Sequence, residues 1–418
     1  MDKIYLGIQH FATDGTLNTT STVPNEMTTF FHRRLIQLAD PEKRYSELAS
    51  EFDLPENAGK TVNIRIPEKA SAKLGTLTEG VNPTGSSLTI NNITATLGIY
   101  GDVTPLSDLF ARTAYDNVFK IAFDKMASEA GITLDCVDRN AALEGTSVMY
   151  APTWNGTTPT DVSTRYALDN TAVFTVDLAF KAAALLAAND APRFDGYYGA
   201  VIHPYVKFDL QQNQHQSFND TMKYTTPDKL FKGELGELGG IRFMESSNAK
   251  VYKAEKLKVA NTTTPLVDYL TVSATVSAST VITVTESLTA EELIGRKVLV
   301  GDTQCEITDN AAGSITVDVS VSASAGSKVY PGEAGKENAA VFATIVCGRD
   351  AYFSSKLESE REFKMITKTA SSGGVENPLE MYSTVGWRAI HAAAKAVDDY
   401  MVRIETGSSM GSAITKAN

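Results

Sequence analysis

Histidine and cysteine are the residue types in this sequence that most often bind metals or carry a reaction, and their spacing here matches no known site. The five histidines occupy positions 10, 32, 203, 215 and 391 and lack the His-Glu-x-x-His spacing that places two imidazoles on one face of a helix. The three cysteines occupy positions 136, 305 and 347 and form no Cys-x-x-Cys pair. We therefore predict no metal site, no cofactor and no disulfide framework, as is usual in a reducing compartment.

Two short stretches match the letters of chemical motifs but not their setting. Residues 233–240 read GELGELGG, which resembles GxGxxG only loosely and indicates a turn before a strand. Residues 407–411 read GSSMG, the letters of a nucleophile elbow, but they lie in a C-terminal tail that we expect to be frayed. Neither stretch predicts a phosphate site or a nucleophile.

The remaining reactive side chains also favour structural roles. His203 precedes Pro204 at the end of an expected buried strand, where a hydrogen-bonded structural histidine is more common than a catalytic one. The acidic pairs at 291–292 and 398–399 fit solvated surfaces. Because no nucleophile, base and orienting group come together, we predict no catalytic residue and no enzyme activity.

Composition narrows the class of protein further. The chain has 418 residues, enough for two or three domains, and a net charge of -12 with no long run of Lys or Arg. An acidic chain is not typical of a protein that binds nucleic acid directly. No apolar run is long enough for a transmembrane helix, and residues 1–11 do not resemble a secretory signal. We expect no contact with a membrane.

The elements that would organise such a chain begin with a long helix. Residues 104–131 carry apolar side chains at three- and four-residue spacing, with Thr104 as the expected N-cap, Pro105 at the first helical position and Gly131 as the stop. Just before it, residues 61–66 and 88–100 alternate like strands and flank a glycine-rich tip, which predicts a long hairpin. A hairpin of this kind needs support from another surface, because two strands alone are marginally stable.

The rest of the chain predicts an α+β fold. Residues 1–22 are expected to be an extended arm, and residues 24–40 an amphipathic helix. Residues 171–189 predict a second helix, residues 197–204 a buried strand and residues 205–212 a short helix. Residues 255–335 are rich in Thr, Ser and Val in alternating runs, which predicts an inserted all-β domain, either a sandwich or a barrel.

Three stretches of the sequence resemble a known family. They are GKTVNIRIPEKASAKLGTLTEGVNPTGSSLTINNITATLGIYGDVTPLSDL at 59–109, APRFDGYYGAVIHPYVKFDLQQ at 191–212 and GELGELGGIRFMESSNA at 233–249. These stretches resemble the major capsid proteins of tailed bacteriophages, in the branch related to the capsid proteins of certain short-tailed phages. The resemblance spans about 24–254 and 336–405, and the segment 255–335 departs from it.

The resemblance implies the Johnson fold and a division of the chain. Residues 1–58 would be an N-terminal arm and helix, 59–103 an extended loop reaching over a neighbouring subunit, and 104–170 the spine helix and peripheral domain. Residues 171–254 would be the axial domain, 255–335 an inserted β-domain, and 336–418 the completion of the axial and peripheral domains with the C-terminal tail. The charged residues of the extended loop would contact the neighbour: Arg65, Glu68, Lys69, Lys73 and Glu79.

The resemblance also implies a function. The chain would assemble with itself, as hexamers and pentamers, into an icosahedral shell that encloses double-stranded DNA without binding it specifically. Scaffold, portal and decoration proteins would be its further partners. It would be assembled in the host cytoplasm and reside in the virion capsid. The alternative is a glycan-binding or hydrolytic surface protein that uses the β-rich segment, which would need clustered aromatic side chains or paired carboxylates.

Overall fold

The computed structural model shows an α+β protein whose sheets are mainly antiparallel. It describes residues 43–55, 59–69, 87–113, 118–154, 158–212, 234–261, 265–357, 363–369, 379–415 and 417–418, the pair 79–80, and the single residues 72, 74, 76, 82, 156 and 263. For residues 113 and 234–237 only the backbone is described. The expected arm at 1–22 and helix at 24–40 lie outside these residues. The chain divides into two compact units. The described residues of the first unit are 99–113, 118–131, 363–369 and 379–390, and the other described residues belong to the second.

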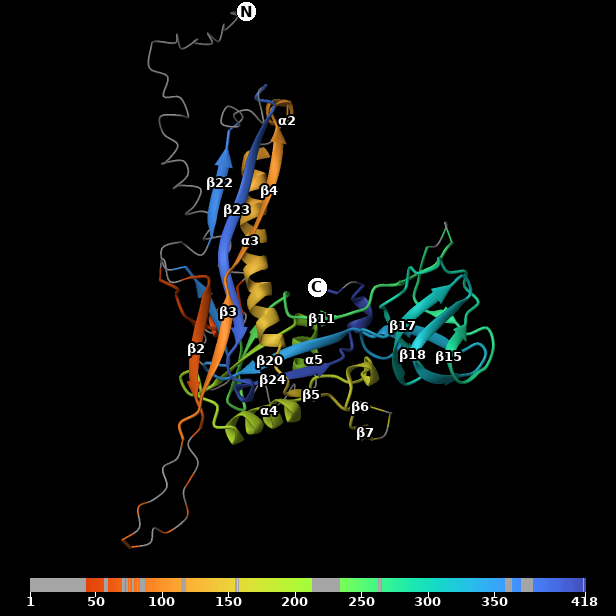
Figure 1. Ribbon diagram of the computed structural model, residues 1–418, viewed down its shortest axis with the longest axis horizontal. Helices are drawn as coiled ribbons and strands as arrows, with labels where there is room; N and C mark the ends of the chain where they lie inside the picture. Colours follow the sequence, from red (N-terminus) through yellow and green to blue (C-terminus); the bar gives the residue numbers. More distant parts are fainter. Residues whose placement is uncertain are drawn as a thin grey trace, which may run out of the picture. The chain divides into compact units, whose positions relative to one another are not determined.

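A seven-stranded sheet forms the centre of the second unit (Figure 1). Its path is β5 (Val148–Tyr150), β24 (Met401–Thr406), β20 (Val341–Cys347), β8 (Tyr198–Ile202), β10 (Ile241–Glu245) and β9 (Glu234–Leu238), and β11 (Val251–Tyr252) pairs with β20. Every residue of β8 and β20 is buried, as expected for central strands covered on both faces.

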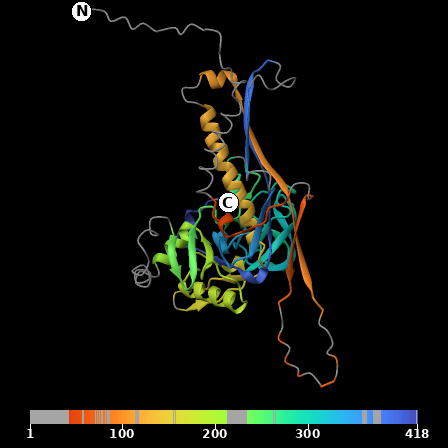
Figure 2. The ribbon, with the colours of Figure 1, turned by 90° about the vertical axis from the view of Figure 1, so that its left-hand side faces the viewer.

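Two hydrophobic clusters cover the two faces of this sheet. On one face, α4 (Val176–Ala188) and α5 (Pro204–Gln212) pack on alternate strand residues such as Ala200 and Ile202. On the other face, Val201 and Ile345 pack with Tyr45, Leu48 and the end of α3. The expected second helix is confirmed as α4, which lies along the sheet in both views of the ribbon (Figures 1 and 2). Its N-cap is Thr175, whose hydroxyl accepts from the backbone N–H of Leu178.

The turn expected at GELGELGG is a tight hairpin. Strands β9 and β10 pair antiparallel on either side of Gly239 and Gly240. Both glycines have positive φ, 62° and 81°, which is the backbone that a two-residue type I′ turn requires. These glycines therefore serve a turn, and the stretch does not open a helix that could hold a phosphate.

In the first unit, the expected start of the long helix is wrong. Residues Gly98–Ser107 form strand β4, which pairs with β23 (Tyr382–Lys395), and β23 also pairs with β22 (Lys364–Lys368). Helix α2 (Asp108–Thr113) begins only after this strand. A Cβ at Gly101 would overlap the carbonyl oxygen of Trp387 in β23. Only glycine therefore allows β4 to lie this close to β23 at position 101.

Local chemistry explains where the helix does begin. The hydroxyl of Ser107 accepts from the backbone N–H of Phe110 at 3.2 Å, so Ser107 takes the capping role that was expected of Thr104. Asp108 stands in the first turn and pairs with Arg112 at 2.8 Å. Pairing with a strand almost 300 residues away in sequence therefore outweighs the local preference of Thr104 and Pro105 for a helix start.

The expected end of the helix at Gly131 is also wrong, because α3 runs over Val118–Leu143. Glycine inside a helix costs about 1 kcal/mol relative to alanine. Beyond Gly131, the helix buries Leu134, Asp135 and Asp138 completely. The packing and hydrogen bonds of these side chains outweigh the local cost of the glycine.

The described residues of the segment 257–331 form a small β-barrel with its own core, which we call the barrel. Its six-stranded sheet has the order β14 (Leu270–Thr271), β19 (Lys328–Pro331), β16 (Lys297–Val300), β17 (Thr303–Ala311), β18 (Ser314–Ala323) and β15 (Val276–Thr283). A bridge between Val272 and Val284 joins the two ends of this order. A separate cluster of buried residues fills it, including Ile282, Val298 and Ile307.

The C-terminal residues are packed and not frayed, which corrects the expectation from their composition. Gly407 and Ser408 are buried. The side chain of Asn418 donates to the carbonyl of Ala249 at 2.7 Å and accepts from the N–H of Val251 at 2.8 Å. Small residues are needed here because neighbouring backbone approaches closely, and composition alone cannot reveal that.

A matched pair of glycine substitutions tests this packing. A Cβ at Gly407 would overlap the carbonyl oxygen of Asp169, whereas a Cβ at Gly313 would have no closer neighbour than an oxygen 3.9 Å away. We expect Gly407→Ala to lower the free energy of unfolding by about 1–3 kcal/mol, and Gly313→Ala to leave it nearly unchanged. Urea unfolding of both variants measures the difference. Equal stabilities would contradict the packed C-terminal segment.

Candidate functional site

The hairpin of β2 (Thr61–Pro67) and β3 (Ile90–Thr96) is the candidate site. All seven residues of β2 pair in register with β3, from Thr61 opposite Thr96 to Pro67 opposite Ile90. Among the described strands, neither β2 nor β3 pairs with a third one. Figures 1 and 2 show the two strands side by side, leading away from the central sheet of their unit. Only Val62 and Ala95 of the pair are buried, so most of the hairpin surface is free for a partner.

The charged residues predicted for this loop do not form one cluster. Arg65 lies within β2, opposite Asn92, and is exposed. Glu68 and Lys69 follow the end of β2, and Glu79 lies in a turn of the tip; all three are exposed. Lys73 lies outside the described residues.

Lys69 contacts its own chain. Its ammonium donates to the carbonyl of Asn189 at the end of α4, lies 3.8 Å from the Asp190 carboxylate and 5.6 Å from the ring centroid of Tyr400. Carbonyls at a helix C-terminus, a carboxylate and an aromatic face all favour a cation. A contact between Lys69 and a neighbouring subunit would therefore have to share or replace these partners.

Exposed apolar side chains of the hairpin are the feature that the sequence reasoning missed. Leu74 is 92% exposed, Leu88 79% and Ile90 47%. Exposed apolar side chains grouped on one element indicate a surface that another molecule covers. The available signal was leucine in an otherwise polar, glycine-rich stretch.

The first unit carries several exposed apolar side chains. Val103 on β4 is 57% exposed, Leu109 on α2 73% and Ile121 on α3 56%. Leu379 and Met381, just before β23, are 78% and 63% exposed. Both units thus offer apolar surface for association, each on its own elements.

His203 is a structural histidine, as the sequence favoured. It is buried; its Nδ1 lies 3.2 Å from the backbone N–H of Tyr205, which donates to it, and its ring packs on those of Tyr205 and Phe342. Burial lowers the pKa of His203 to about 4, although Glu245 acts in the opposite direction. The neutral imidazole is therefore the folded form near neutral pH.

This lowered pKa makes a prediction about acid. Below a pH of about 6.5 the unfolded chain protonates His203 while the folded chain does not, so the free energy of unfolding falls until the pH reaches the folded pKa. We expect His203 to account for about 2–3 kcal/mol of the stability lost between about pH 7 and about pH 4. Urea unfolding at both values should show a smaller loss for His203→Asn than for wild type. The same loss in both proteins would contradict the assignment.

A buried polar cluster surrounds the last part of α3 in the second unit. Asp135 accepts from the backbone N–H groups of Arg44 and Tyr45 at 2.8 and 2.9 Å and from Asn248 at 2.6 Å. Burial raises the pKa of Asp135, and these hydrogen bonds act in the opposite direction. Asp138, completely buried, accepts from Ser46 and lies 2.7 Å from Nε2 of His391. Because both Ser46 and His391 bond to the carboxylate, the histidine is not placed as the base for the serine.

A second cluster of buried charged side chains stabilises β24. Glu405 is completely buried and accepts from Nε and Nη2 of Arg165 at 2.7 and 2.5 Å. Its carboxylate also lies 2.9 Å from Nε of Arg403. The Arg165 guanidinium lies 3.5 Å from the ring centroid of Tyr252. The cluster joins a central strand to the loop before α4, which is a structural role.

The GSSMG stretch does not form a nucleophile site. The hydroxyl and backbone N–H of Ser409 both bond to the carboxylate of Asp209, and the hydroxyl of Ser408 accepts from the N–H of Met410.

Burial raises the pKa of Cys347 to about 12 and also raises that of Cys305. In the part of the chain that the structure describes, no three His, Cys, Asp or Glu side chains are grouped to hold a metal ion.

Within the described ranges, no helix combines the length and the apolar character needed to cross a bilayer.

Comparison with known proteins identifies the fold. No protein-family model matches the sequence, and no curated protein matches it. Among solved structures, the capsid of Ralstonia phage GP4 is similar with a TM-score of 0.51 and 12% identity, over 88% of this chain and 92% of that one. The capsid structure of the cyanophage P-SCSP1u is similar with a TM-score of 0.50 and 13% identity, over 88% of this chain and 89% of that one. The resemblance seen in the sequence is thus confirmed, and this chain has the fold of bacteriophage capsid proteins.

Proposed function

We propose that this chain is the major capsid protein of a tailed bacteriophage. It assembles as hexamers and pentamers into an icosahedral shell that encloses double-stranded DNA, and its role is structural and not enzymatic. The observation that carries the proposal is the β2–β3 hairpin on a capsid-protein fold. Its strands pair only with each other among the described strands, and its apolar side chains are exposed, with Leu74 at 92% and Leu88 at 79%.

The hairpin supports assembly through a simple free-energy argument. A two-stranded ribbon is marginally stable in water, and exposed leucines gain about 1.5–3 kcal/mol each on full burial. A neighbouring subunit that covers the hairpin supplies both the support and the burial. In this proposal Arg65, Glu68, Lys73 and Glu79 contact the neighbour at the polar edge of that surface.

The proposal assigns the parts of the chain as the Johnson fold would. Residues 1–58 are the N-terminal arm and helix, 59–103 the extended loop, 104–170 the spine helix and peripheral domain, and 171–254 the axial domain. Residues 255–335 are an inserted β-domain, and 336–418 complete the axial and peripheral domains. The separate core of the barrel supports the assignment of the insertion.

The charge of the chain fits enclosure of DNA better than binding. With a net charge of -12, the wall as a whole repels the phosphate backbone, so packaged DNA is not held by it. Scaffold, portal and decoration proteins are the further partners of such a shell. Assembly takes place in the host cytoplasm, and the product resides in the virion.

Expression of the full chain, alone and with a co-expressed scaffold, tests the proposal. Analytical ultracentrifugation and negative-stain microscopy are expected to find capsomers, tubes or closed shells. Material that stays monomeric under both conditions would overturn the proposal.

A further inference from the structure

Two segments connect the barrel to the rest of its unit: the incoming segment, residues 253–256, and the outgoing segment, residues 332–339. Side-chain hydrogen bonds link the two segments. We propose that this joint is rigid: Asn338 and Arg296 lock the barrel in one orientation on the body, so it does not swing on flexible linkers. The inference does not depend on shell assembly, because every contact that carries it lies within one chain. A rigid joint would make every copy of the chain present the same barrel face in the same direction.

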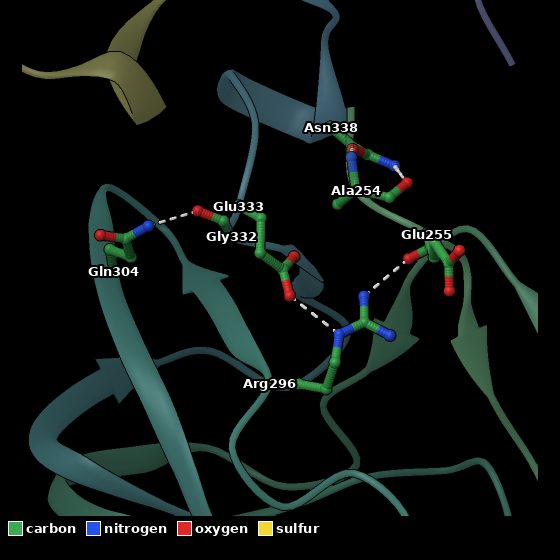
Figure 3. Close-up of polar contacts among 7 residues, drawn as sticks. All are labelled: Ala254, Glu255, Arg296, Gln304, Gly332, Glu333 and Asn338. Atoms are coloured by element: carbon green, nitrogen blue, oxygen red, sulfur yellow. Dashed lines mark hydrogen bonds and ion pairs between the residues drawn. The ribbon is translucent and has the colours of Figure 1, made fainter. Parts of the chain in front are cut away.

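Asn338 hydrogen-bonds to the incoming segment through both the oxygen and the nitrogen of its side-chain amide. The backbone N–H of Ala254 donates to Oδ1 of Asn338 at 3.1 Å, and Nδ2 of Asn338 donates to the carbonyl of Ala254 at 3.3 Å (Figure 3). The ammonium of Lys253 donates to the carbonyl of Asn338. Asn338 is only 6% exposed, so water competes little for these bonds.

Arg296 bridges the two segments from the barrel side. Its Nε donates to the carboxylate of Glu333 at 2.8 Å, and its Nη2 donates to the carbonyl of Glu255 at 2.8 Å, as Figure 3 shows. One guanidinium thus holds the outgoing and the incoming segment together. Gln304 adds a bond to the carbonyl of Gly332, whose own N–H donates to Lys297 at 2.7 Å.

The outgoing segment is fixed to the body as well as to the barrel. The backbone N–H of Lys336 donates to the carbonyl of Leu168 at 2.7 Å, and Leu168 belongs to the core of the central sheet. A Cβ at Gly335 would lie 2.5 Å from that same carbonyl oxygen, so the backbone there is closely packed. Few residues are left between the part held by the barrel and the part held by the body.

The backbone of this segment points to the same conclusion. Glu337 and Asn338 both have positive φ, 54° and 59°. This region costs a residue such as glutamate about 1–2 kcal/mol, whereas asparagine adopts it more readily. Two such residues in succession persist only where surrounding contacts fix the backbone. A flexible tether would relax to negative φ, so the contacts at Asn338 are strong enough to prevent it.

Spin-label distances in the full chain test the joint. One label goes on exposed Ala187 of α4 through Ala187→Cys, and the other on exposed Ser320 of the barrel through Ser320→Cys. Half-buried Cys136 is replaced by Ser, while Cys305 and Cys347 are buried with raised pKa values and do not take the label. Labelled protein is diluted into an excess of unlabelled protein, so that only distances within one chain are measured.

Three substitutions distinguish the effect of the side-chain hydrogen bonds from that of the backbone conformation. Asn338→Gly removes the hydrogen bonds to Ala254 but tolerates positive φ. Arg296→Met removes the hydrogen bonds to Glu333 and Glu255 but keeps the aliphatic part of the side chain. Glu337→Gly is the matched control, because it changes a neighbouring residue of the same backbone conformation whose side chain is exposed.

Double electron–electron resonance is expected to give one narrow distance distribution for wild type and for Glu337→Gly. Combining Asn338→Gly with Arg296→Met should broaden it by about twofold, as for short flexible linkers. A broad wild-type distribution would overturn the proposal, and that measurement does not depend on the folding of any variant. A double variant as narrow as wild type would show that other contacts fix the barrel, which also overturns the role of these two residues.

Discussion

Replacing residues 70–87 by Asn-Gly is expected to give a chain that folds normally and does not assemble. Glu68 donates to Thr89 at 3.1 Å, directly after the last pair of the β2–β3 register, Pro67 opposite Ile90. Continuing this register places Lys69 opposite Leu88, and two residues between them make the favoured hairpin turn. The replacement removes Leu74 and the tip while keeping both strands.

The expected effect on assembly is a complete loss, because the replacement removes Leu74 and the tip, which a neighbour would cover. Thermal unfolding should change little, since no described residue of 70–87 belongs to the core clusters of the unit. Sedimentation of the variant beside wild type measures both outcomes. A milder control, Leu88→Ser, removes one exposed side chain and should slow assembly without abolishing it. Normal particles from the 70–87 replacement would contradict the proposed role of the hairpin.

Removing the buried carboxylate of Glu405 is expected to cause a large loss of stability. Glu405→Leu leaves Arg165 and Arg403, whose side chains are 29% and 15% exposed, without the negative charge beside their guanidinium groups. Breaking a buried ion pair from one side typically costs about 3–5 kcal/mol. The strand that carries Glu405 is paired on both sides, to β5 and β20, so it cannot move aside to expose the arginines to water.

A surface ion pair supplies the control for this experiment. Lys181 and Asp177 lie 2.7 Å apart on α4, with side chains 60% and 71% exposed. Asp177→Asn should cost less than about 1 kcal/mol, because water screens and replaces an exposed pair. Urea unfolding of the two variants compares the losses. Similar losses would contradict the account of Glu405 as a buried brace.

Elements with local determinants were predicted well from the sequence. Helix α4 follows Thr175 and Asp177 and is built from residues of high helix propensity, and strand β8 is a short apolar run that ends before Pro204. Turn chemistry was equally informative at Gly239 and Gly240. In each case the residues that decide the structure are neighbours in the sequence.

Two segments take a structure that differs from their local preference, because distant contacts decide it. Residues 104–107 carry helix-start residues but lie in a strand, because β23 pairs with them. Residues 391–395, HAAAK, favour a helix locally but belong to β23, where Ala392 and Ala394 lie opposite Ser355 and Phe353. Long-range strand pairing overrides propensity, and a single sequence gives no information about it.

The position of the candidate site was predicted from the sequence, but the type of side chain most exposed on it was not. The hairpin was expected from alternation and turn residues, and it is present at β2 and β3. The sequence pattern favoured charged residues as the contacts. The structure instead exposes leucines, whose burial by a partner would release the most free energy. Whether Leu74 and Leu88 are covered depends on tertiary structure, which the local pattern does not reveal.

Cryo-electron microscopy of the particles formed by the full chain tests the central claim most directly. The claim predicts closed shells of hexamers and pentamers in which the β2–β3 hairpin of one subunit lies on its neighbour, with Leu74 and Leu88 buried between them. Particles in which the hairpin contacts only its own subunit, or the absence of any shell with and without a scaffold, would contradict it.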